Sequence, residues 1–110
     1  MEAIKSNTKM TPYYYVGTTI QVSPDEFIKL ACEALGITPD ILRLKSRKGE
    51  LVFIRAAIIR RLMELYDNLT LKKMGKLINR DHSTVLYYRD RMPSSPEYEN
   101  NYKKLLTLVY

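Results

Sequence analysis

The chain has 110 residues, 45% of them hydrophobic, and a net charge of +6. This length allows one domain with a modest core, and no apolar run approaches the roughly 18 residues that a membrane span requires. Residues 1–10 lack the apolar region of a secretory signal, and a single cysteine, Cys32, cannot form an internal disulfide, so we expect a cytoplasmic protein in a reducing compartment.

The positive charge is concentrated in the middle of the chain. Residues 41–92 contain 13 Lys and Arg against 5 Asp and Glu, a net charge of +8, whereas the remaining residues carry −2. Solvated helix faces explain such an asymmetry about as well as a polyanionic partner does. A nucleic-acid-binding motif in the same segment would favour the partner.

Residues 1–22 differ in composition from the rest of the chain. Three consecutive tyrosines (13–15) and the run from Thr18 to Val22 are rich in strand-forming residues, which predicts an extended arm or a short hairpin. These tyrosines either stack on nucleic acid bases or, as the preferred interpretation, pack against the protein or form a self-association surface. We expect residues 23–110 to form one helical domain.

Two helix starts follow the arm. Ser23-Pro24-Asp25-Glu26 combines a serine cap, a proline at the first helical position and a glutamate at the third, and Gly36 ends this helix. Thr38-Pro39-Asp40 begins a short second helix by the same logic, and we expect three apolar residues there to face inward: Ile41, Leu42 and Leu44.

A short basic stretch, residues 45–49, is predicted as the linker between this helix and the longest one, which is predicted over residues 50–66. The long helix carries an apolar stripe typical of the scaffold of a small helical domain: Leu51, Ile54, Ile58, Leu62 and Leu65. Arg55, Arg60 and Arg61 lie off that stripe.

The segment from Thr70 to Met92 is predicted to form two helices joined by a tight turn. Thr70 and Asp81 are the expected N-caps, and Asn79 suits the left-handed conformation that closes the first helix. The second helix opens with short polar side chains and has an apolar stripe of Val85, Tyr88 and Met92, whereas Thr84, Tyr87 and Arg91 share another face. This is the plan of a helix-turn-helix whose second helix contacts bases. After a break at residues 93–96, a last helix has Tyr98, Tyr102, Leu105 and Val109 as its packing face, which is a second candidate for self-association.

The residues Arg-Asp-His-Ser-Thr-Val-Leu (80–86) resemble the RDHTTVLHA signature of the DNA-binding domain of the bacterial replication initiator DnaA. Residues 70–75, TLKKMG, resemble that family's SLPEIG segment, and the resemblance extends back to about Pro24. Ser83 replaces a threonine of the family, Asn79 a glycine and Tyr88 an alanine. The resemblance implies an all-α helix-turn-helix domain that binds double-stranded DNA.

The residues that we expect to contact DNA follow from the motif and from this resemblance. Base contacts are expected from the start of the second helix of the motif: Asp81, His82, Ser83 and Thr84. For Asp81, a helix cap and an acceptor for a cytosine amino group are compatible roles. The resemblance places Arg47, or alternatively Lys48, in the minor groove and Arg55 near a phosphate; Lys72, Lys73 and Arg80 complete the predicted phosphate contacts, with Lys76 as a further candidate.

Catalysis is not expected. The chain has no GxxxxGK[ST] phosphate loop, which predicts a DNA-binding protein without an ATPase of its own, unable to open a replication origin alone. One histidine and one cysteine do not make a zinc site of the usual type, so we expect no metal and no cofactor. The main alternative is a protein–protein interaction module that retains the fold.

Overall fold

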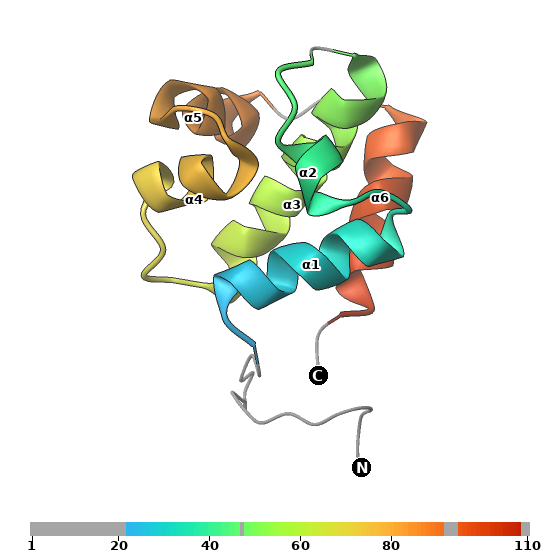
Figure 1. Ribbon diagram of the computed structural model, residues 1–110, viewed down its shortest axis with the longest axis horizontal. Coiled ribbons are helices and arrows are strands. Elements are labelled where there is room, and N and C mark those ends of the chain that lie inside the picture. Colours follow the sequence, from blue (N-terminus) through green and yellow to red (C-terminus); the bar gives the residue numbers. More distant parts are fainter. Residues whose placement is uncertain (1–21, 47, 92–94, 109–110) are drawn as a thin grey trace.

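The computed structural model describes residues 22–46, 48–91 and 95–108, and the regular structure of these ranges is entirely helical (Figure 1). The helices are α1 (Pro24–Ala34), α2 (Pro39–Leu42), α3 (Gly49–Leu65), α4 (Leu71–Ile78), α5 (His82–Asp90) and α6 (Pro96–Leu106). The predicted all-α fold is therefore confirmed. The predicted arm, residues 1–22, lies outside the described residues except for Val22. None of the helices in the described ranges has the length and apolar character needed to cross a membrane.

Most of the helices begin where the sequence predicts a cap. The side chains of Ser23, Thr38, Thr70, Asp81 and Ser95 each accept a hydrogen bond from the backbone N–H three residues later. Each bond satisfies one of the N–H groups that a helix start leaves without a partner inside the helix. Helix α3 is the exception, because Lys48 caps it without a side-chain hydrogen bond. The local sequence thus sets the position of five of the six helices.

Helix α3 forms the centre of the molecule, with α1 and α6 packed along it and α4 and α5 on the other side (Figure 1). Its buried residues extend beyond one stripe, because two alanines, Ala56 and Ala57, and Ile59 are fully buried as well. Arg55 and Arg61 are also buried, with 1% and 6% of their surface exposed. A helix that is covered on several sides buries residues off its apolar stripe as well, and these two arginines are among them.

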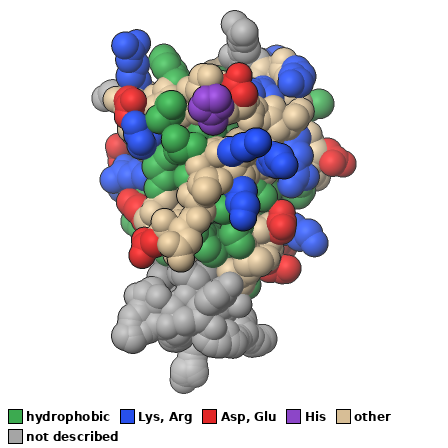
Figure 2. Space-filling view, turned by 90° about the vertical axis from the view of Figure 1, so that its left-hand side faces the viewer, with side chains coloured by type: hydrophobic (Ala, Val, Ile, Leu, Met, Phe, Trp, Pro, Cys, Tyr) green, Lys and Arg blue, Asp and Glu red, His purple; other side chains and the backbone are tan. Residues whose placement is uncertain are grey.

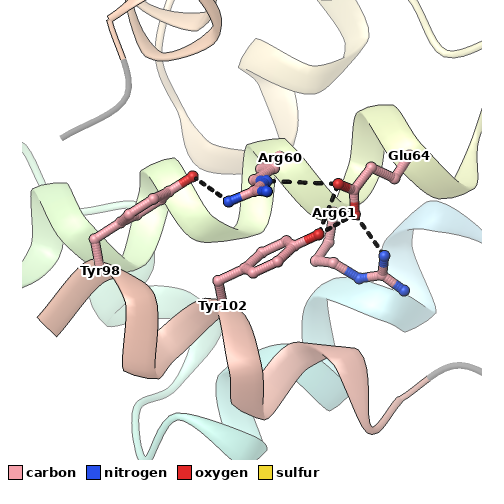
Figure 3. A network of polar contacts seen from close by, with 5 residues as sticks. All are labelled: Arg60, Arg61, Glu64, Tyr98 and Tyr102. Atoms are coloured by element: carbon pink, nitrogen blue, oxygen red, sulfur yellow. Dashed lines mark hydrogen bonds and ion pairs between the residues drawn. The ribbon is translucent and has the colours of Figure 1, made fainter. Parts of the chain in front are cut away.

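Helix α6 is held on α3 by a polar network beside the apolar contact (Figure 3). Arg60 Nη1 donates to the hydroxyl of Tyr98 at 3.3 Å, and the guanidinium of Arg60 lies 3.7 Å from the ring centroid of Tyr102. The hydroxyl of Tyr102 donates to Glu64, 2.7 Å from Oε2, and Arg61 pairs with the same carboxylate at 2.5 Å. Burial opposes ionisation of Glu64, but the hydrogen bonds from Tyr102 and Arg61 outweigh it and lower the pKa of this carboxyl.

The short helix α2 corrects one expectation about the core. Leu42 is fully buried, as predicted, but Ile41 is 39% and Leu44 53% exposed. Helix α2 has only four residues, so it presents one inward position rather than a stripe. Leu44 lies beyond its end, in the loop between α2 and α3.

Candidate nucleic-acid interface

Helices α4 and α5 pack against each other across a tight turn formed by residues 79–81. Asn79 has φ 58° and ψ 48°, the left-handed conformation predicted for this position. The backbone N–H of Arg80 donates to the carbonyl of Gly75 at 2.8 Å. A Cβ atom at Gly75 would collide with the backbone carbonyl of Arg80, so this close approach requires glycine. The turn that defines the motif therefore depends on Gly75 and Asn79.

Helix α5 has a buried apolar face, and its N-terminal end is polar and exposed. Val85 and Tyr88 are buried in the core, as predicted, whereas Asp81, His82 and Ser83 are exposed. Met92, the third residue of the predicted stripe, lies outside the described residues. Because the buried face fixes the helix, the first turn of α5 is presented outward as a surface of short polar side chains.

Asp81 and Thr84 are joined to each other in this first turn. Oδ1 of Asp81 accepts the backbone N–H of Thr84 at 3.1 Å and the hydroxyl of Thr84 at 3.2 Å. The bond from the Thr84 N–H is the largest of the influences that lower the pKa of Asp81, so this carboxylate stays ionised at neutral pH. An ionised carboxylate is an acceptor only, which fits both the cap and contact with an amino group.

One turn later, α5 exposes an aromatic residue on the face of Thr84. Tyr87 is 55% exposed, and its ring centroid lies 5.9 Å from the guanidinium carbon of Arg91. Its ring also meets the buried ring of Tyr88 edge to face, with centroids 6.2 Å apart. The sequence places Thr84, Tyr87 and Arg91 on one face but gives Tyr87 no role; the signal that could have found it is its spacing of three residues from Thr84.

Exposed lysines lie on α4 and before α3. Lys72, Lys73 and Lys76 are exposed on α4, and Lys48 is exposed at the start of α3. Figure 2 looks onto the side of the molecule that carries α4 and α5, where Lys and Arg side chains lie on both sides of the centre. Arg47, predicted for the minor groove, lies outside the described residues, so its role stays a prediction from the sequence.

The structure corrects the role of one predicted phosphate contact. Arg55 is 1% exposed, and its guanidinium donates to the carbonyls of Leu42 at 3.0 Å, Ser46 at 2.7 Å and Leu44 at 2.5 Å. Burial, and then the charge of Arg80, lowers the pKa of Arg55. A buried guanidinium with three backbone partners is not presented to a phosphate, and Arg55 instead supports the loop before α3.

Arg80 donates to two of the carbonyls that Arg55 binds, but its side chain is only partly buried. Its Nη2 atom donates to the carbonyl of Leu44 at 2.7 Å and to that of Ser46 at 3.3 Å, and its Nη1 atom donates to Asn79 at 2.8 Å. Its charge therefore lies beside the interface while its hydrogen bonds serve the loop. Within the described residues, no group of three or more His, Cys, Asp and Glu side chains could hold a metal ion.

Comparison with known proteins gives a consistent result. The family model described as the bacterial DnaA helix-turn-helix matches residues 24–91, from the start of α1 to the end of α5. No solved structure matches the chain.

Three of the relatives that match are chromosomal replication initiator proteins DnaA. The protein of Ureaplasma parvum is 29% identical over 86 residues, which cover 77% of this chain and 19% of the relative. The protein of a Picosynechococcus species is 34% identical over 71 residues, with 64% and 16% covered. That of Bacteroides thetaiotaomicron is 36% identical over 70 residues, with 63% and 15% covered. The chain thus spans less than a fifth of the length of each of these three relatives.

The matched residues contain the cap, the turn and the polar start of α5, which are the parts that make the motif. Membership of the family implies DNA binding. The chain belongs to the bacterial DnaA helix-turn-helix family.

Proposed function

We propose that this chain binds double-stranded DNA in a sequence-specific manner, with α5 in the major groove. The observation that carries this proposal is the division of α5, which buries Val85 and Tyr88 and exposes the polar side chains of its first turn. A helix anchored in this way presents its N-terminal residues to base edges, and its free backbone N–H groups favour a nearby phosphate.

The polar residues at the start of α5 divide into two groups by chemistry. His82 and Ser83 have hydrogen-bonding side chains at the exposed start and are assigned to base edges. Asp81 and Thr84 act as a pair, with the carboxylate as acceptor for a cytosine amino group and the threonine methyl against a thymine methyl. Tyr87 extends this surface by one turn and offers an apolar ring to the same groove.

The cations around α5 are assigned to the DNA backbone. Lys72, Lys73 and Lys76 lie on α4, the helix that crosses the backbone in a helix-turn-helix complex. Lys48, together with its sequence neighbour Arg47, is assigned to the adjacent minor groove, where a narrow A·T-rich segment attracts cationic side chains. Arg55 is left out of this set because it is buried.

We infer a regulatory role in replication or transcription in the cytoplasm, exerted by binding and not by catalysis. The names of the relatives support replication, and the sequence of this chain contains no nucleotide-binding loop of the GxxxxGK[ST] kind. A protein-interaction module gains no support from α6, because Tyr98 and Leu105 on that helix are buried in the core.

The test is selection of bound duplexes from a random DNA pool, followed by binding to single-base-pair variants of the enriched site at fixed salt. We expect one enriched motif. His82→Ala should cost roughly 1–3 kcal/mol on that motif and remove discrimination at one or two base pairs. Lys72→Ala is the matched control, since loss of a phosphate contact should weaken binding to every variant alike. If no motif is enriched, or if His82→Ala lowers affinity equally for all variants, α5 does not recognise sequence.

A further inference from the structure

The loop between α2 and α3 is held by arginine side chains acting on its backbone. We call residues 43–46, with Lys48, the basic loop. The carbonyl of Leu44 accepts hydrogen bonds from Arg55 at 2.5 Å and from Arg80 at 2.7 Å, and that of Ser46 accepts from the same two residues at 2.7 and 3.3 Å. Arg55 comes from α3, whereas Arg80 comes from the turn before α5. The loop is therefore bonded to the central helix and to the helix-turn-helix at the same carbonyls.

A second set of bonds joins the basic loop to the end of α4 and to Asn79. The Nδ2 atom of Asn79 donates to the carbonyl of Arg43 at 3.0 Å, and Nε of Arg43 donates to the carbonyl of Leu77 at 2.9 Å. These bonds run in opposite directions, so each segment supplies both a donor and an acceptor. They connect residues 34 and 36 positions apart in the chain.

Asn79 fulfils two requirements at one position. Its backbone adopts the left-handed conformation that ends α4, a conformation that glycine and asparagine accept most readily. Its amide adds the hydrogen bond to Arg43, which a glycine would lack. The side chain of Asn79 is exposed, so the bond serves to connect two segments and does not fill a space in the core.

We propose that Asn79 and Arg80 are positioning residues that lock the basic loop to the start of α5, so that both contact DNA as one rigid body. The lock fixes the distance, measured in base pairs, between the DNA segment that α5 contacts and the segment that the loop contacts. This inference rests on the proposed DNA binding. It names the residues that set the spacing between the DNA contacts of α5 and those of the basic loop.

Two substitutions each remove some of these hydrogen bonds. One of them keeps the backbone conformation of the turn, and the other keeps the positive charge. Asn79→Gly keeps the left-handed turn and deletes only the amide. Arg80→Lys keeps the positive charge next to the DNA but replaces a planar fork of donors with a single ammonium, which cannot hold the same set of carbonyls. Lys72→Ala is the control, because Lys72 is exposed on α4 and takes part in none of these hydrogen bonds.

The first measurement needs no DNA. Amide hydrogen exchange of the full chain should be faster over residues 43–48 in Asn79→Gly and in Arg80→Lys by about tenfold, because opening of the loop no longer breaks these bonds. Exchange in α3 should be unchanged, and so should that of the loop in Lys72→Ala. Exchange of the loop at the parental rate in both lock variants would overturn the proposal.

The second measurement separates positioning from simple stability. One base pair, about 3.4 Å along the axis, is inserted into the selected duplex between the segments protected by α5 and by the loop. The parent should lose affinity by roughly tenfold or more, as for a mismatched site, whereas the lock variants should lose less than about threefold. Unchanged spacing preference in both variants would overturn the positioning role alone. Failure of the parent to bind any duplex would overturn the proposed function and the positioning role together.

Discussion

The salt dependence of binding tests which cations meet phosphates. Four exposed Lys residues are assigned to DNA, and each of them, Lys48 beside the minor groove included, is taken to neutralise one phosphate: Lys48, Lys72, Lys73 and Lys76. At about 0.9 per phosphate contact, they give a slope of about −3.6 for log affinity against log salt. Between about 50 and 200 mM salt, affinity for the selected duplex should then fall about 150-fold.

The double variant Lys72→Ala/Lys73→Ala removes half of this set. Its slope should be about −1.8, so that the same change in salt weakens binding only about 12-fold. If Arg55 and Arg80 also met phosphates, the parental slope would be about −5.4 and the loss about 1,800-fold. The parental slope therefore also tests whether Arg55 and Arg80 contact phosphates. The guanidinium of Arg55 is buried on backbone carbonyls, so we expect no such contact from it.

The assay is a fluorescence anisotropy titration of a labelled duplex at five salt concentrations. Lys103→Ala/Lys104→Ala is the matched control, because both lysines are exposed on α6, on the other side of α3, and their removal changes the net charge equally. The control should keep the parental slope. A double variant of α4 with the parental slope, or a control that lowers it as much, would refute the assignment of the α4 lysines to phosphates.

Three further changes test the fold and the edge of the interface. Gly75→Ala should lower the free energy of unfolding by roughly 1–3 kcal/mol, because its Cβ meets the Arg80 backbone; an unchanged midpoint in urea would contradict this close approach. The lowered pKa of Glu64 means that its stabilising contribution is present above the ordinary carboxyl pKa of 4.5 and is lost as pH falls below it. Glu64→Gln should therefore be less stable at neutral pH and lose less stability on acidification, and parallel melting curves against pH would count against the contact with Tyr102. Tyr87→Ala should lower the thermal midpoint only slightly, through the lost edge-to-face contact with Tyr88, but cost roughly 1 kcal/mol in binding to the selected duplex, and an equal affinity would remove Tyr87 from the interface.

The sequence predicts the features that depend on neighbouring residues. Thr70 and Asp81 lie three residues before the N–H groups that they bind, and Asn79 takes the conformation that its type favours. Val85 and Tyr88 share a face because the helical repeat places them there. Each of these signals is complete within one or two turns, so the order of helices and the turn of the motif could be derived without the fold.

The sequence does not predict features that depend on distant partners. The guanidinium of Arg55 finds carbonyls 9 to 13 residues earlier, and Arg80 finds carbonyls more than 30 residues away. Nothing in the local pattern distinguishes such an arginine from one that faces solvent. The pattern also assigns Ile41 and Leu44 to the core, but a helix as short as α2 buries only Leu42.

The two faces of α5 have a consequence for how such domains diverge. His82 and Ser83 are exposed, so their replacement disturbs no buried contact and should change stability by only about 0.5 kcal/mol or less. Asp81 is less free to vary, because loss of a helix cap costs roughly 0.5–2 kcal/mol. Under the proposed mode of binding, mutation can therefore change the preferred DNA site through two positions while the scaffold stays intact. A lineage that carries this domain can then acquire a new DNA target by single substitutions, and every intermediate protein remains folded.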